Sequence, residues 1–118
     1  MIKGLHHVQL AAPAGSEPLL REFYGGVLGL QEVPKPPDLA KRGGVWFRGE
    51  GVEVHLGIED DFRPARKAHP AFLVDDLNAF STEPPDDLLP GYRRIYLMDP
   101  VGNRIELLQK CEVHPVVA

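Results

Sequence analysis

Short apolar stretches, several of them alternating with polar residues, run along this chain and predict β-strands. The predicted strands are Gly4 to Ala12, Leu30 to Val33, Val45 to Arg48, Val52 to Ile58, Ala71 to Val74, Arg94 to Met98 and Arg104 to Leu108. Apolar residues from Leu19 to Leu28 recur instead at helical spacing, after the N-cap candidate Ser16. A brief second helix is predicted over Asp75 to Ser81.

The order strand, helix, strands therefore occurs twice, which predicts an α+β fold. We expect two βαβββ modules that form a curved mixed sheet around a cavity. Within a single domain, 1–118, module one spans about 4–58, a linker 59–68, module two about 69–109 and a tail 110–118. The prolines of 34–37 predict an extended loop. In module two, Glu83 to Gly91 is predicted to be irregular, with one weak strand hidden in 86–91.

Strand parity divides the side chains into two rows, because successive residues point to opposite faces. One row is apolar and should pack on the helices; it consists of Val8, Leu10, Val54, Leu56, Phe72, Val74, Ile105 and Leu107. The opposite row carries His7, His55, His69 and Glu106. His6 has the wrong parity for this row. If the sheets curve, the second row lines one concave surface.

Three imidazoles and a carboxylate facing inward are a plausible site for a divalent metal ion. Two histidines and one carboxylate leave coordination positions open for a substrate. Taken singly, each histidine is better explained as a surface residue or as a core residue with satisfied hydrogen bonds. Only the shared parity of all four favours a metal, and parity alone leaves both interpretations open.

Composition narrows the functional classes. The 118 residues carry a formal net charge of −4, so the composition shows no excess of basic residues of the kind that binds nucleic acid. A single cysteine, Cys111, excludes an internal disulfide framework and fits a reducing compartment. No apolar run approaches the length of a membrane span, and no signal peptide is predicted at the N-terminus. We expect a cytoplasmic protein without nucleic-acid or membrane partners.

The motifs of the chain resemble the vicinal oxygen chelate superfamily, which includes glyoxalases, bleomycin-resistance proteins and extradiol dioxygenases. They are GLHHVQLAAP, REFYGGVLGLQEV, HPAFLVDDL and YLMDPVGNRIELLQ, and they cover nearly the whole chain. The resemblance implies that His7, His69 and Glu106 are metal ligands. His55, in EVHLGIE, stands at the place of the remaining ligand, where it would be a fourth ligand or a base.

The resemblance implies several possible activities, since members isomerise, transfer thiols, oxygenate or only bind drugs. We predict a glyoxalase-like enzyme of the isomerase or lyase class, with one divalent ion (Zn, Ni, Mn or Fe) and with Glu106 and His55 as catalytic groups. The alternative is a metal-free, bleomycin-resistance-type binding protein. An extradiol dioxygenase is less favoured, because the expected histidine before Tyr96 is missing from 86–94. The loop that binds potassium in fosfomycin-resistance transferases also has no counterpart.

Four further residues are candidates for binding a small-molecule substrate: Trp46, Arg48, Arg94 and Tyr96. Core packing is the competing explanation for Trp46. Arg94 could hold an anionic substrate or pair with Glu53 or Asp99. Asp99 and Asn103 are better explained by the turn that they form than by a site. The resemblance further implies a homodimer, with cavities built across modules or subunits.

Overall fold

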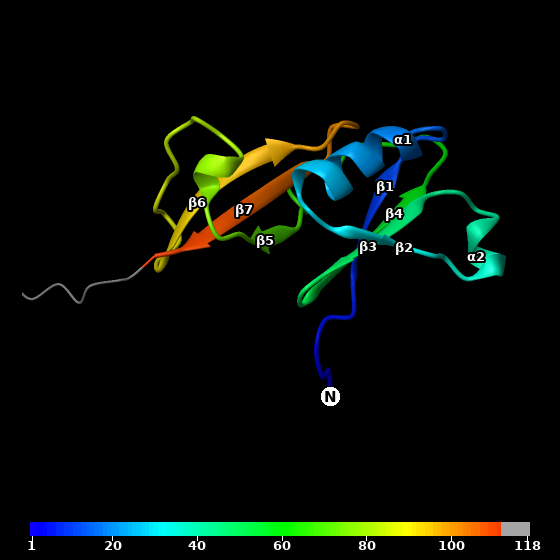
Figure 1. Ribbon diagram of the computed structural model, residues 1–118, viewed down its shortest axis with the longest axis horizontal. Coiled ribbons are helices and arrows are strands. Elements are labelled where there is room, and N and C mark those ends of the chain that lie inside the picture. The colour runs from blue at the N-terminus through cyan, green and yellow to red at the C-terminus, as the bar shows by residue number, and fades with distance from the viewer. Residues whose placement is uncertain (112–118) are drawn as a thin grey trace, which may run out of the picture.

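In a computed structural model, which describes residues 1–111, the chain forms two β-sheets joined by a loop segment (Figure 1). The first sheet has the strand order β1-β4-β3-β2, built from β1 (Val8–Ala12), β2 (Gln31–Val33), β3 (Val45–Gly49) and β4 (Val52–Ile58). The second has the order β5-β7-β6, built from β5 (Ala71–Leu73), β6 (Tyr92–Met98) and β7 (Arg104–Lys110). The α+β class and the two-module organisation are confirmed.

Each module repeats one pairing pattern. Its first strand lies parallel to its last strand, β1 to β4 and β5 to β7, while the next neighbours are antiparallel. The strand expected within 86–91 is reduced to an isolated bridge between Asp86 and Arg94. Prolines at 84, 85 and 90 cannot donate to a ladder, which explains why this segment does not extend into a full strand.

The helical segments differ in detail from the prediction. The first begins as α1 (Glu17–Leu20) and continues as the π-helix η1 (Arg21–Val27), where the paired glycines 25 and 26 weaken regular α-helical geometry. The second is a single 3₁₀ turn, η2 (Leu77–Ala79). The loop predicted over 34–37 is extended up to Pro36, and a short helix, α2 (Pro37–Ala40), begins at its last residue, because proline fits the first turn of a helix.

The apolar row predicted from parity forms the core. Leu10, Val54, Leu56, Ile105 and Leu107 are buried together with Leu20 and Tyr24 of the helix. Val8, Phe72 and Val74 pack against this cluster from the edges. Strand parity therefore placed the interior correctly in both sheets. None of the helices in the described part of the chain is both long and apolar enough to cross a membrane.

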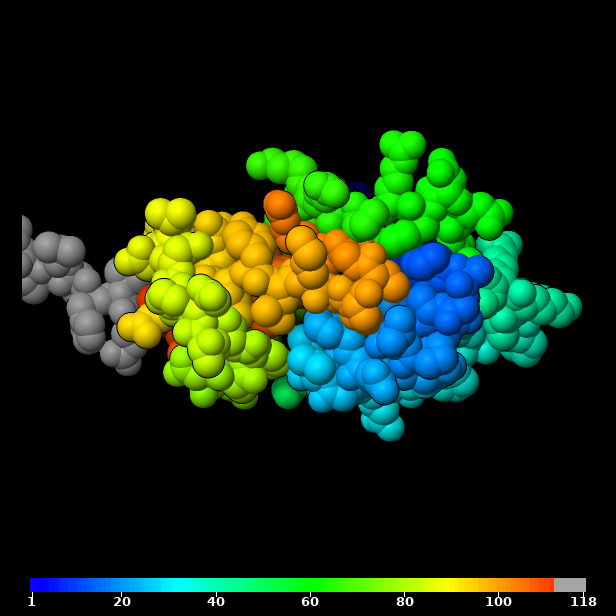
Figure 2. Space-filling view, turned by 90° about the horizontal axis from the view of Figure 1, so that it is seen from above, coloured from blue at the N-terminus to red at the C-terminus, as the bar shows by residue number. Residues whose placement is uncertain are grey.

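A polar network ties the two modules together. Tyr24 donates its hydroxyl to Asp99 at 2.7 Å, and Asn103 donates its side-chain amide to the carbonyl of Ala11 at 2.9 Å. The side-chain oxygen of Asn103 also accepts the backbone N–H of Ala65, in the linker, at 2.8 Å. Figure 2 shows the helix of module one lying directly against the β6–β7 turn, which carries Asp99 and Asn103. The Asp99–Asn103 turn thus has a second role, that of joining the modules.

Candidate metal centre

The four residues expected to share a cavity form two pairs, one on each sheet. His7 stacks on His55, with ring centroids 4.0 Å apart and an interplanar angle of 19°. His69 Nε2 lies 2.9 Å from Glu106 Oε1. Within residues 1–111, no group of three or more histidine, cysteine, aspartate or glutamate side chains is placed to hold a metal ion. The convergence of all four in one cavity stays a prediction.

Register explains why the members of each pair meet. Gln9 of β1 lies opposite His55 of β4, and His55 opposite Trp46 of β3, so His7 just before β1 reaches the His55 ring. In the second sheet, Ala71 of β5 lies opposite Glu106 of β7, and Glu106 opposite Tyr96 of β6. Because His69 lies two residues before Ala71, its side chain points to the same face of the sheet as Ala71, and it lies beside Glu106.

The hydrogen bonds of His69 define its protonation. Its Nδ1 lies 2.9 Å from the carbonyl oxygen of Arg66 and 3.0 Å from that of Lys67. Carbonyl oxygens only accept, so Nδ1 carries a proton and the neutral ring has its lone pair on Nε2. Nε2 then faces the carboxylate of Glu106, a second acceptor, at 2.9 Å. Two acceptors at this distance require a proton or a cation that both can bind.

This donor set suits a divalent metal. An imidazole whose other nitrogen is anchored by backbone carbonyls is the usual arrangement of a metal-binding histidine. The pair is mostly buried, with side-chain exposures of 14% for His69 and 11% for Glu106, so few waters compete for the donors. The residues therefore fit the metal that the sequence predicts, although one chain supplies only two donors at this point.

His7 is the remaining predicted ligand. Its Nδ1 lies 2.9 Å from Nδ1 of His6, which the parity argument had set apart from the site. Burial lowers the pKa of His7 below its ordinary value of 6.5, and positive charge on His55 or His6 lowers it further. A lowered pKa favours the neutral ring, which is the form that binds metal.

His55 is buried and held on every side. Trp46 of β3, which lies opposite His55 in register, stacks on it with a centroid distance of 3.8 Å and an interplanar angle of 3°. His55 Nε2 lies 2.7 Å from Glu53 Oε2, and Arg48 donates to the other oxygen of Glu53 at 2.8 Å. Hydrogen bonds from His55 and Arg48 lower the pKa of Glu53 to about 2. The sequence had suggested Glu53 only as a possible partner of Arg94, and not as a partner of His55.

The candidate substrate residues divide in the same way. Trp46 and Arg48 lie with His55, whereas Arg94 and Tyr96 lie with Glu106 on the second sheet. Arg94 does not pair with Glu53 or Asp99, as the sequence had suggested; it donates to Asp86 at 3.1 Å. Its second guanidinium nitrogen lies 4.0 Å from Glu106 Oε2. Tyr96 is 45% exposed, with the Arg94 and Arg104 guanidinium groups over its ring.

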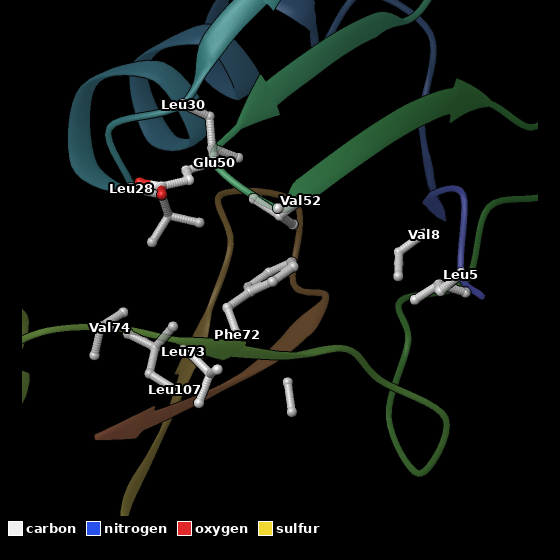
Figure 3. A pocket seen from close by; sticks show the side chains of 12 residues that line it. Leu5, Val8, Leu28, Leu30, Glu50, Val52, Phe72, Leu73, Val74 and Leu107 are labelled. Carbon is white, nitrogen blue, oxygen red and sulfur yellow. The ribbon is translucent and has the colours of Figure 1, made fainter. Parts of the chain in front are cut away.

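Two cavities lie near these pairs. An apolar cavity of about 290 Å³ between the modules is lined by Val8, Leu30, Val52 and Phe72 among others, on the core side of the sheets (Figure 3). A second hollow of about 540 Å³ runs along β1 and is bordered by the loop 63–70, including His69. His69 thus faces the open side of β1, but His55 and Glu106 do not line this hollow.

Comparison with known proteins finds solved structures that resemble this chain over nearly its whole length. A glyoxalase family protein from Bacillus anthracis is 44% identical over 94% of this chain and 98% of its own, with a TM-score of 0.86. A glyoxalase/dioxygenase from Nostoc punctiforme is 25% identical over 93% of this chain and 92% of its own, with a TM-score of 0.70. The fosfomycin resistance protein FosX from Listeria monocytogenes, at 19% identity over 94% of this chain and 96% of its own, shares the fold with a TM-score of 0.68. No family model and no curated protein matches the sequence.

Proposed function

This chain belongs to the glyoxalase family, and we propose that it is a divalent-metal-dependent enzyme of the isomerase or lyase class, acting on a small substrate with two adjacent oxygens. The observation that carries the proposal is the pair of acceptors, His69 Nε2 and Glu106 Oε1, facing each other at 2.9 Å. Backbone carbonyls already take the Nδ1 proton of His69, so the pair is preorganised for a cation.

The ligand set would be His7, His69 and Glu106, with zinc, nickel, manganese or iron as the candidate ions. When bound, such an ion supplies Lewis-acid stabilisation of an enolate or oxyanion formed on the chelated substrate. Arg94 and Tyr96, beside Glu106 on the same sheet, would orient the substrate on one side. Trp46 and Arg48, beside His55, would line the other side.

A second copy of the chain would complete the site, with His7 and His55 from one protomer and His69 and Glu106 from the other. Three features support this homodimer. The metal donors are split between two sheets. Strands β1 and β5 lie at the ends of their sheets, where an edge is available for pairing. Leu5 and Leu73, next to or in these strands, are 82% and 71% exposed, which favours burial by a partner.

Metal analysis of protein purified without an affinity tag tests the proposal. We expect close to one ion per chain, or retention of one ion per chain after adding Zn²⁺, Ni²⁺, Mn²⁺ or Fe²⁺ and removing the excess. Absence of stoichiometric metal under all these conditions would overturn it. A cytoplasmic location, expected from the single cysteine, is part of the same proposal.

A metal-free binding protein is the second candidate. It is favoured by the absence, within residues 1–111, of a three-donor cluster in one chain. It would use the same face of the sheets, with Trp46 and Tyr96 as aromatic contacts for an uncharged or drug-like ligand. Light scattering separates the two candidates at the level of assembly, because a monomer at micromolar concentration would leave the metal donors permanently divided.

A further inference from the structure

Two arginines give the hollow along β1 a positive charge. The hollow has a volume of about 540 Å³, and Arg63, Arg66 and His69 are among the residues that line it. Within residues 1–111, no aspartate or glutamate lines this hollow, although the acidic residues 59–61 come just before the loop. An anionic group that enters the hollow therefore meets two guanidinium groups and, in this part of the chain, no like charge on the walls.

Both arginines of the hollow are available to a ligand. Each is exposed, and within the described residues no carboxylate lies within ion-pair distance of either guanidinium group. Arg21, Arg48 and Arg94 differ, because each of them pairs with a glutamate or an aspartate. A guanidinium group presents a planar fork of N–H donors that matches the oxygens of a carboxylate or a phosphate. Binding an anion in the hollow therefore breaks no ion pair of the described chain.

The backbone between the two arginines is held by the β6–β7 turn. Ala65 donates its N–H to the side chain of Asn103 at 2.8 Å, and its carbonyl accepts the N–H of Arg104 at 2.9 Å. Asn103 is fully buried. Pro64 lies so close to Gly102 that a Cβ atom at Gly102 would meet the proline ring at 3.3 Å. A fixed backbone loses less conformational entropy when a ligand binds, which favours a site on this loop.

Arg66 connects the hollow with the proposed metal centre. Its backbone carbonyl lies 2.9 Å from Nδ1 of His69, and both residues line the same hollow. Gln9 of β1 lines it as well, and its side-chain amide can donate a further hydrogen bond to an anion. A ligand group bound by Arg66 therefore lies in the cavity that His69 faces.

We propose that the hollow along β1 is an anion-binding pocket, in which Arg63 and Arg66 hold a carboxylate or phosphate group of the substrate. Arg94, the candidate for an anionic substrate from the sequence, already donates to Asp86. The inference deepens the proposed function, because it gives the substrate a negative charge apart from the two oxygens that would bind the metal. It rests on that function only for the role of His69 as a ligand.

Anion binding to the metal-free full-length protein tests the pocket directly. Inorganic phosphate and malonate are titrated separately at constant ionic strength, and the backbone ¹H–¹⁵N signals of Gln9, Ala65 and His69 are followed. We expect saturable shifts of these signals with at least one of the two anions. Saturation by phosphate alone assigns a phosphate group to the pocket, and saturation by malonate alone assigns a carboxylate. No saturable shift with either anion would overturn the proposal.

Charge-matched variants distinguish a pocket from a general attraction to positive charge. Arg63→Gln and Arg66→Gln should each weaken binding of the saturating anion roughly tenfold, through loss of a hydrogen bond between charged groups. Lys67→Gln is the control, because Lys67 is exposed and lies in the same loop but does not line the hollow. It should change the affinity by less than about twofold, since salt screens a charge outside the pocket. Equal losses in all three variants would contradict the proposal.

Titration of the same proteins with Zn²⁺ separates this inference from the proposed function. Arg63→Gln should bind Zn²⁺ within about twofold of the wild type, because Arg63 is not one of the proposed ligands. If Zn²⁺ binds and neither anion does, the pocket proposal alone fails. If the anions bind as expected and Zn²⁺ binds nowhere, the metal-dependent function fails, and the hollow is still an anion-binding site.

Discussion

The hydroxyl of Tyr24 donates to the carboxylate of Asp99 at 2.7 Å, across 75 residues of sequence and between the two modules. Tyr24 is fully buried and Asp99 is 4% exposed. Asp99 also accepts hydrogen bonds from the backbone N–H groups of Val101 and Asn103, at 3.0 and 2.8 Å. The turn between β6 and β7 is therefore a fully hydrogen-bonded unit docked on the helix of module one.

Tyr24→Phe removes one of two hydrogen bonds to Asp99 Oδ2, and the side-chain amide of Asn103 still donates to this oxygen at 3.0 Å. We expect the free energy of unfolding to fall by about 1.5–3 kcal/mol, the usual contribution of a hydrogen bond to a charged group. Urea unfolding followed by circular dichroism measures it. Tyr92→Phe, at the half-buried start of β6, is the control and should change stability much less. Equal losses in both variants would show that the contact between the modules adds nothing.

His69→Ala should abolish metal binding, since it removes the nitrogen that faces Glu106. His6→Ala should leave metal stoichiometry unchanged, because His6 is exposed and belongs to the opposite parity, with its ring against the neighbouring His7. Metal content after dialysis against excess Zn²⁺ distinguishes the two variants. Equal effects of the two substitutions would refute the parity argument for the ligands.

The proposed sharing of ligands between protomers makes a sharper prediction. Neither His7→Ala nor His69→Ala protein should bind metal alone. When the two variants are mixed and reassembled, some dimers contain one copy of each variant. In such a dimer one of the two sites combines the intact His7 of one protomer with the intact His69 and Glu106 of the other. About a quarter of the wild-type metal content should therefore return. The mixture of His69→Ala with Glu106→Ala is the control, because at each proposed site both residues come from the same protomer, and no mixed dimer then has an intact site. No recovery in the first mixture, despite exchange of subunits, would mean that the ligands are not shared.

The ion pair of Glu53 predicts a specific acid dependence of stability. The folded protein holds the pKa of Glu53 at about 2, compared with an ordinary value of 4.5. The unfolded chain therefore binds this proton first as the pH falls, and stability from the carboxylate, fully present above pH 4.5, is lost towards pH 2. The stability difference between wild type and Glu53→Gln should shrink across this range. A constant difference in urea unfolding between pH 5 and pH 2 would contradict the contribution of the charge.

Much of the fold follows from local sequence. The period of two in Val52–Ile58 and Arg104–Leu108 identified both central strands and their buried faces, because one face of each packs on the core. The segment 86–91 and the helix at Pro37–Ala40 were less predictable. Prolines lie in or next to both segments, and a proline is compatible with an extended loop as well as with the first turn of a helix. The sequence alone therefore does not distinguish a loop from a single helical turn.

For the candidate site, parity placed His7, His55, His69 and Glu106 in a single row; in the structure His7 contacts His55, and His69 contacts Glu106. It could not show that the pairs lie on separate sheets, since parity describes a face and not its position in space. It also missed the partners of Arg94 and His55. Asp86 and Glu53 supply them through contacts that depend on side-chain reach, and the only signal for Glu53 was its place two residues before His55.

The stacking of Trp46 on His55 gives the protein an intrinsic optical reporter. Trp46 is the only tryptophan among the 118 residues, so all indole emission comes from this one place. With the two rings 3.8 Å apart, a change in the charge of the imidazole acts directly on the excited indole. The fluorescence of the unlabelled protein should therefore change when a proton or a ligand binds next to Trp46 and His55.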